Sequence, residues 1–186
     1  MTINYKTTNS MLLRVDKSTY KKMDKTLIIL ILDNVRSAIN VGSIFRTADA
    51  FKIEKIYLCG ITCRPPHKEL LKSALGSTES VDWEYRTNTS ELVSELKTNK
   101  NSKIYTVEQT ENSIYLDKFT PKLDEKTILI FGNEVDGVDQ EIVNLSDGSI
   151  EIPQFGTKHS LNVAVSAGIV LWDVFSKLNI NNESNP

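Results

Sequence analysis

Apolar runs alternate with amphipathic segments along most of the chain. The run TLIILILD at 26–33 is almost wholly apolar and rich in isoleucine, which is typical of a strand buried on both faces. Residues 40–52 follow with apolar positions at helical spacing. Further strands are predicted at 55–60, 81–86, 103–109, 126–134 and 149–153. Further helices are predicted at 66–77, 89–99 (capped by Thr89 or Ser90), 139–145 and 160–177.

This alternation indicates an α/β fold with a mostly parallel sheet flanked by helices. We expect one domain at 26–178, preceded by a basic arm at 1–25 and followed by a disordered tail at 179–186. Polar clusters follow three of the strands, at 33–34, 132–134 and 153–162. Because the carboxyl ends of parallel strands share one edge, these clusters together predict a ligand site.

Composition narrows the function classes. The net charge of the 186 residues is −2 and the pI is about 5.8, which argues against binding nucleic acid by bulk charge but leaves room for a local basic patch. Two cysteines indicate no disulfide framework and favour a reducing, cytoplasmic setting. We expect no membrane partner, because no apolar run reaches membrane-spanning length and the N-terminus lacks a signal-peptide core.

Common nucleotide and nucleophile motifs do not occur in the sequence. It lacks G-x-G-x-x-G, G-x-x-x-x-G-K-[ST] and G-x-S-x-G, which disfavours an ordinary dinucleotide site, a P-loop NTPase and an α/β-hydrolase. Cys59, Cys63 and His67 recur at a spacing of four, but a fourth ligand would have to come from elsewhere. No metal site is predicted.

Three segments, in order, resemble one family. They are NVRSAINVGSIFRTADAF at 34–51, LIFGNEVDGVDQEI at 129–142 and IEIPQFGTKHSLNVAVSAGIVLW at 150–172. They are similar to the three motifs of the SpoU/TrmH family of SPOUT RNA 2′-O-ribose methyltransferases. The resemblance implies a C-terminal trefoil knot, S-adenosylmethionine as cofactor, tRNA or rRNA as substrate, and a homodimer.

The resemblance also implies roles for particular residues. Cofactor contacts are expected from Thr106, Val107, Glu108, Phe131, Gly132, Asn133, Ile152, Gln154, Ser160 and Leu161. Catalytic roles are expected for Arg46, Asn40, Glu134, Ser160 and Asn162. RNA contacts are expected from Arg14, Lys17, Arg36, Arg46, Lys158 and His159.

Methyl transfer to a ribose hydroxyl requires alignment of two atoms and removal of a proton from a poor nucleophile. A guanidinium hardly ever deprotonates, so Arg46 is expected to fix a phosphate or hydroxyl and to stabilise the developing alkoxide, in its own subunit or across a dimer. Asn40 and Ser160 are expected to cap helices as well as face the site. Glu134 is expected to hold Arg46 or Asn40.

The last predicted helix is apolar nearly all round, so one face covers the sheet and the other needs a partner, which favours a homodimer. Val135 and Asp136 stand where the family often has glycine after the glutamate, so the loop is expected to shape the site differently. The alternative function is a catalytically degenerate homologue that acts as an RNA-binding module.

Overall fold

Seven parallel strands form one sheet in a computed structural model that describes residues 4–8 and 15–183. Their order across the sheet is β3-β2-β1-β6-β4-β7-β5. The strands are β1 (Thr26–Asp33), β2 (Ile53–Cys59), β3 (Trp83–Arg86), β4 (Ser102–Val107), β5 (Ile114–Tyr115), β6 (Lys126–Phe131) and β7 (Gly148–Glu151). The α/β fold with a parallel sheet is confirmed, whereas the two-residue β5 was not predicted.

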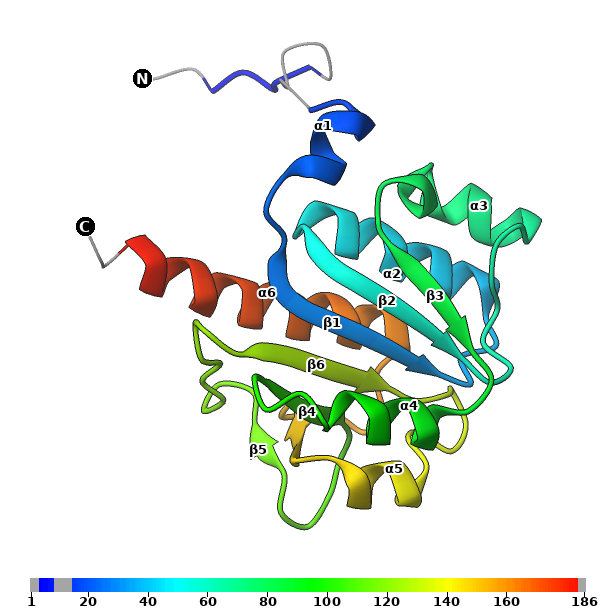
Figure 1. Cartoon of the computed structure of the whole chain (residues 1–186), viewed down its shortest axis with the longest axis vertical. Coiled ribbons are helices and arrows are strands. Elements are labelled where there is room, and N and C mark those ends of the chain that lie inside the picture. Colours follow the sequence, from blue (N-terminus) through cyan, green and yellow to red (C-terminus); the bar gives the residue numbers. More distant parts are fainter. Residues whose placement is uncertain (1–3, 9–14, 184–186) are drawn as a thin grey trace.

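Helices cover both faces of the sheet (Figure 1). They are α1 (Lys17–Lys22), α2 (Ala38–Ala50), α3 (Lys68–Ala74), α4 (Thr89–Leu96), α5 (Gln140–Leu145) and α6 (Val163–Glu183), with a 3₁₀ turn at Ser77–Glu79. Helices α2, α3 and α6 lie on one face, and α4 and α5 on the other. No helix in the described ranges is long and apolar enough to cross a membrane.

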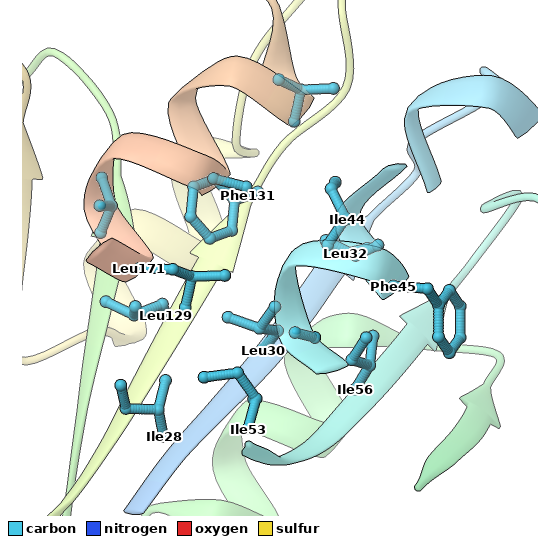
Figure 2. Packing of buried hydrophobic residues seen from close by; sticks show 14 of the residues in the cluster. Ile28, Leu30, Leu32, Ile44, Phe45, Ile53, Ile56, Leu129, Phe131 and Leu171 are labelled. Atoms are coloured by element: carbon cyan, nitrogen blue, oxygen red, sulfur yellow. The ribbon is translucent and has the colours of Figure 1, made fainter. Parts of the chain in front are cut away.

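The inner positions of strand β1, residues 27–32, are all apolar because both faces of the strand are covered. Ile28, Leu30 and Leu32 point into the cluster formed with α2, α3 and α6 (Figure 2). Ile29 and Ile31 point into the opposite cluster, formed with α4 and α5. Successive side chains of a strand face opposite sides, so a central strand covered on both faces must be apolar throughout.

The order of the strands determines which loops meet at the carboxyl edge. Strand β4 lies between β6 and β7. The loops that follow β6 and β7, at 132–138 and 152–161, therefore flank the end of β4. The trefoil knot that the resemblance implies stays a prediction.

Three predicted helix caps were wrong. Ser37 caps α2, since its hydroxyl accepts a hydrogen bond from the Asn40 backbone N–H (3.3 Å), so Asn40 lies in the first turn. Asn162 takes the place predicted for Ser160 and accepts from the Ala164 backbone N–H (2.9 Å). Asn88 caps α4 in the same way. Asn and Ser oxygens compete well for these N–H groups, and the sequence offered several such residues in a row.

The ends of the chain differ in part from the prediction. Within the arm, α1 docks on the domain: the Lys17 ammonium pairs with Glu79 (2.5 Å), and the Tyr20 hydroxyl donates to the Asp49 carbonyl (2.8 Å). At the other end, α6 continues to Glu183, into the segment predicted as a tail.

Candidate active site

A cavity of about 450 Å³ opens at the carboxyl edge of the sheet. Its walls come from three loops: residues 107–109 after β4, 131–137 around the end of β6, and a stretch after β7 that leads into α6. Apolar side chains such as Ile150, Ile152 and Leu161 share the lining with polar ones. This size and mixture are typical of sites for small organic ligands.

The cavity wall at 132–138 is a turn held by hydrogen bonds between its own residues. Asn133 and Gly137 exchange backbone hydrogen bonds (3.1 and 3.2 Å). The Asn133 side-chain oxygen accepts from the backbone N–H groups of Val135 and Asp136, both at 2.9 Å. The two residues that depart from the family pattern therefore form part of a turn built on Asn133.

Glycine at position 132 is required by this turn. A Cβ on Gly132 would lie 2.0 Å from the carbonyl carbon of Gly137, which is backbone and cannot swing away. Gly137 itself has a φ of +71°, in the left-handed region that favours glycine. Gly132 was predicted to contact the cofactor, and the atoms that exclude a side chain at this position belong to the loop's own backbone.

A chain of hydrogen bonds joins the three segments that carry the family resemblance. The Asn40 amide donates to the Glu134 carboxylate (3.1 Å), and the Asn162 amide donates to the Asn40 side-chain oxygen (3.2 Å). Glu134 also accepts from the backbone N–H groups of Arg36 (3.3 Å) and Ser37 (3.2 Å). Glu134 was predicted to hold either Arg46 or Asn40, and its carboxylate accepts a hydrogen bond from Asn40.

Glu134 has a pKa below its ordinary value. Burial alone raises the pKa of this carboxyl. Hydrogen bonds from its own backbone N–H, from the Asn40 amide and from the backbone of Ser37 and Arg36 outweigh burial and lower it. The group is therefore ionised at neutral pH, and its charge is spread over N–H donors at the start of α2.

Nine of the ten residues predicted to contact the cofactor line this cavity. They are Val107, Glu108, Phe131, Gly132, Asn133, Ile152, Gln154, Ser160 and Leu161. Thr106 is the exception, because it is fully buried and its hydroxyl is hydrogen-bonded to that of Ser149 (2.8 Å). Glu134 and Asn162 also line the cavity, while Asn40 reaches it through both of them.

Arg46 does not line the cavity. It is exposed on α2, beside a shallow depression formed with Ser43, Thr47, Ala50 and Phe51. It lies six positions after Asn40, or about 9 Å further along the helix axis. The nearby Asp49 carboxylate accepts from the Ser80 hydroxyl, and no ion pair between it and Arg46 is found in the described residues.

The other predicted RNA contacts are dispersed. Lys17 is paired with Glu79 at the far end of the domain. The Arg36 side chain is exposed beside Glu134, and Lys158 is exposed in the loop after β7. His159 lines the cavity. Arg14 lies outside the described residues.

The first predicted polar cluster, 33–34, is structural. Asp33 is buried, with its carboxylate accepting from the Thr89 hydroxyl (2.5 Å). Burial raises the pKa of Asp33, against the hydrogen bond from Thr89. The Asn34 side-chain oxygen accepts from the backbone of Ile61 (3.1 Å). Two of the three clusters, not all three, form the cavity.

Sequence reasoning missed Gln109. This residue lines the cavity, and its amide donates to the His159 carbonyl (2.9 Å). A polar residue at the end of a predicted strand was the available signal, but no motif marks it. The cysteines at 59 and 63 are free thiols, and the part of the chain that the structure describes holds no group of His, Cys, Asp or Glu suited to a metal ion.

Comparison with known proteins identifies the family. The sequence model of the SpoU rRNA Methylase family matches residues 27–172, which include all three motif segments. The chain belongs to the SpoU rRNA methylase family. A Borreliella burgdorferi relative named an uncharacterized tRNA/rRNA methyltransferase is 33% identical over 162 residues, covering 87% of this chain and 69% of its own length. Other curated relatives are covered over 62% of their length.

Solved structures of SpoU relatives share the fold. The A. aeolicus TrmH/SpoU tRNA modifying enzyme superposes with a TM-score of 0.77 at 28% identity, over 89% of this chain and 82% of that one. An AdoMet-bound rRNA methyltransferase from Sinorhizobium meliloti superposes with a TM-score of 0.72 at 26% identity, over 83% of this chain and 58% of its own.

Proposed function

We propose that this SpoU family member is an RNA methyltransferase that uses S-adenosylmethionine to methylate a ribose 2′-hydroxyl in tRNA or rRNA. The observation that carries the proposal is the hydrogen-bonded chain Glu134–Asn40–Asn162 at the cavity. Three polar side chains from three distant segments are aligned there with a carboxylate at one end. An arrangement of this kind positions a substrate group more precisely than a single side chain does.

The cavity fits the proposed cofactor. Its apolar walls suit an adenine ring, and its loops offer backbone N–H and C=O groups for polar recognition. The S. meliloti relative was crystallised with AdoMet bound. When bound, this cofactor supplies a methyl group already activated by a sulfonium charge. The protein must therefore align the acceptor and assist its deprotonation.

Residues of the chain would perform those tasks. The ribose oxygen forms a bond to the methyl carbon as the carbon–sulfur bond breaks, and its proton passes to a phosphate of the RNA or to another base. The amides of Asn40 and Asn162 orient the ribose, and Glu134 keeps Asn40 in one rotamer by accepting from it. Charge developing on the oxygen needs a cation, for which Arg46 is the candidate.

Arg46 would reach the reacting oxygen from a second subunit. Within one chain it lies on α2 away from the cavity. An exposed apolar stripe on α6, formed by Val165 (51% exposed), Ile169 (38%) and Trp172 (59%), lies near it. The link is Phe51, which borders Arg46 and has its ring 5.8 Å from that of Trp172. Such a stripe supports a homodimer in which each subunit lends Arg46 to its partner.

RNA would be held by local charge. The acidic net charge limits unspecific binding of RNA, so the contacts with RNA would come from residues that border the cavity. Arg36, Lys158 and His159 are the described residues best placed for this. Which RNA is modified would then depend on the shape that these few contacts recognise.

The decisive experiment uses total RNA from a strain that lacks the gene. The RNA is incubated with the purified protein and methyl-labelled S-adenosylmethionine, and the modified nucleotide is mapped. Label in one ribose of tRNA or rRNA is expected. RNA and cofactor binding with no transfer would instead favour the degenerate RNA-binding homologue, and label on a base would exclude the ribose assignment.

The role of Arg46 is tested by mixing two inactive variants. An Arg46→Ala subunit keeps Asn162, and an Asn162→Ala subunit keeps Arg46. If Arg46 acts across the dimer, the mixed dimer has one complete site, and mixing restores activity that neither variant has alone. If mixing restores none although subunits exchange, Arg46 does not act in trans.

A further inference from the structure

Strand β4 ends between the two loops that form most of the cavity. It is hydrogen-bonded to β6 on one side and to β7 on the other. The loop 132–138 follows β6 and the loop 152–161 follows β7. The first residues after β4 are therefore near both loops, and these residues are Glu108 and Gln109, which both line the cavity.

Glu108 holds the loop after β6. One carboxylate oxygen accepts from the Val138 backbone N–H (3.1 Å), and the other accepts from the backbone N–H of Gln109 (2.9 Å). A Cβ on Gly137 would lie 2.2 Å from the first oxygen, so the carboxylate lies directly against the glycine. Glu108 was predicted to contact the cofactor, and in addition each of its oxygens accepts a hydrogen bond from the backbone.

Gln109 holds the loop after β7. Its side-chain N–H donates to the His159 carbonyl (2.9 Å). In the described ranges this is the one hydrogen bond that joins residues 152–161 to any other segment. Residues 155–161 are exposed to solvent, so little else fixes the middle of the loop.

We infer that Gln109 is a positioning residue for cofactor binding, which holds the loop 152–161 against the cavity through the His159 carbonyl. The inference rests on the proposed function, since the cofactor is the S-adenosylmethionine proposed above. The next two residues after His159, Ser160 and Leu161, line the cavity. A tether at His159 therefore fixes the segment that would touch the ligand, and binding need not pay the full entropy of ordering it.

Loss of the tether should weaken the binding of the cofactor without destabilising the fold. A single neutral hydrogen bond contributes about 0.5–1.5 kcal/mol net, so removing it should raise the dissociation constant for S-adenosylmethionine by about three- to tenfold. Because residues 155–161 are exposed and belong to neither apolar cluster, the melting temperature should stay near that of the wild type.

The experiment compares three variants of the full chain. Gln109→Ala removes the donor, and Gln109→Glu keeps the shape but directs a carboxylate at the His159 carbonyl. Gln140→Ala is the matched control, because Gln140 is an exposed glutamine on α5 whose amide bonds only to Asn144 of the same helix. Calorimetry gives the dissociation constant for S-adenosylmethionine, and NMR relaxation reports on the order of the backbone at 155–161.

Both Gln109 variants should bind S-adenosylmethionine more weakly and show lower backbone order at 155–161, while the Gln140 control matches the wild type. Glu108→Gln should instead speed hydrogen exchange at the Val138 N–H, since an amide cannot accept at both positions. Unchanged affinity or unchanged backbone order in Gln109→Ala overturns the inference. If the wild type itself binds no S-adenosylmethionine, the proposed function fails, and the relaxation data still decide whether Gln109 is the tether.

Discussion

The two loops that face each other across the cavity are held in opposite ways. The loop 132–138 has backbone hydrogen bonds between its own residues, and its Val138 N–H donates to the Glu108 carboxylate. The loop 152–161 lacks such a turn, and the bond from Gln109 joins its middle to the rest of the described chain. One wall of the cavity is therefore fixed by its own turn, and the other by a single side chain.

This difference indicates that the two walls of the cavity have different roles in ligand binding. A wall that is fixed before the ligand arrives can present its backbone groups at no cost in ordering. A loosely tethered wall can move aside to admit a ligand and then settle on it. The chain Glu134–Asn40–Asn162 spans both, because Glu134 belongs to the first loop and Asn162 follows the second.

The largest effect is expected from Gly132→Ala, which breaks the fixed wall. The added Cβ would meet the Gly137 carbonyl carbon at 2.0 Å, so the backbone of the turn must shift. We expect a loss of about 3 kcal/mol in the free energy of unfolding, as for severe overpacking. Calorimetry should show a melting temperature lower by about 10 °C.

Gly156→Ala is the matched control in the tethered wall. No atom lies within 4 Å of a Cβ built on Gly156. The same substitution there should change the free energy of unfolding by no more than about 0.5 kcal/mol. Equal losses at both glycines would mean that the two loops do not differ in how their backbones are fixed.

Asn40→Ala should give the next largest effect, because it cuts the link between the walls. Both hydrogen bonds of the Asn40 side chain are lost, so Asn162 is no longer aligned with Glu134. Misplacing a reacting group by about 1 Å can cost about a hundredfold in rate, and we expect a fall of that order in kcat. The KM for S-adenosylmethionine should change little, since Asn40 does not line the cavity directly. A raised KM with unchanged kcat would assign Asn40 to cofactor binding instead.

A pair of variants can separate two functions of Asn162, the cap of α6 and the hydrogen bond to Asn40. Asn162→Ala removes the cap of α6 and should cost about 1 kcal/mol of stability. Asn162→Asp keeps an oxygen for the Ala164 N–H but loses the amide that donates to Asn40. The aspartate variant should therefore melt near the wild type and still lose turnover. If it retained full turnover, the bond to Asn40 would have no catalytic role.

Much of the fold could be predicted because strand burial determines the pattern. A run such as 26–33 is apolar at consecutive positions only when both faces are covered, which indicates a parallel sheet with helices on both sides. Helix starts were less predictable. Ser37 and Asn40 can both cap, and so can Ser160 and Asn162, and which oxygen wins depends on the path of the preceding loop.

Prediction of the candidate site rested on the family resemblance. Those motifs pointed to Glu134, Asn40 and Asn162, and the structure links them by hydrogen bonds. Thr106 was also predicted to contact the cofactor, but strand alternation turns its side chain into the core while its neighbour Val107 faces the cavity. Gln109 was missed because its partner is a backbone carbonyl 50 residues away, which no local pattern encodes.

The smallest expected effect is a loosening of the fixed wall in acid. The pKa of Glu134 lies below its ordinary value of 4.5, so its hydrogen bonds add stability above that pH and lose it as the pH falls through the lowered value. Solvent screens this group, so the change should be modest. Hydrogen exchange at the Arg36 and Ser37 N–H groups, which donate to Glu134, should quicken in acid beyond the intrinsic trend. Glu134→Gln removes the titrating group and should abolish that excess.

The tethered wall should not respond to pH over the same range, because the bond from Gln109 to the His159 carbonyl involves no carboxylate. Equal acid sensitivity of both walls in the wild type and in Glu134→Gln would show that Glu134 does not anchor the first.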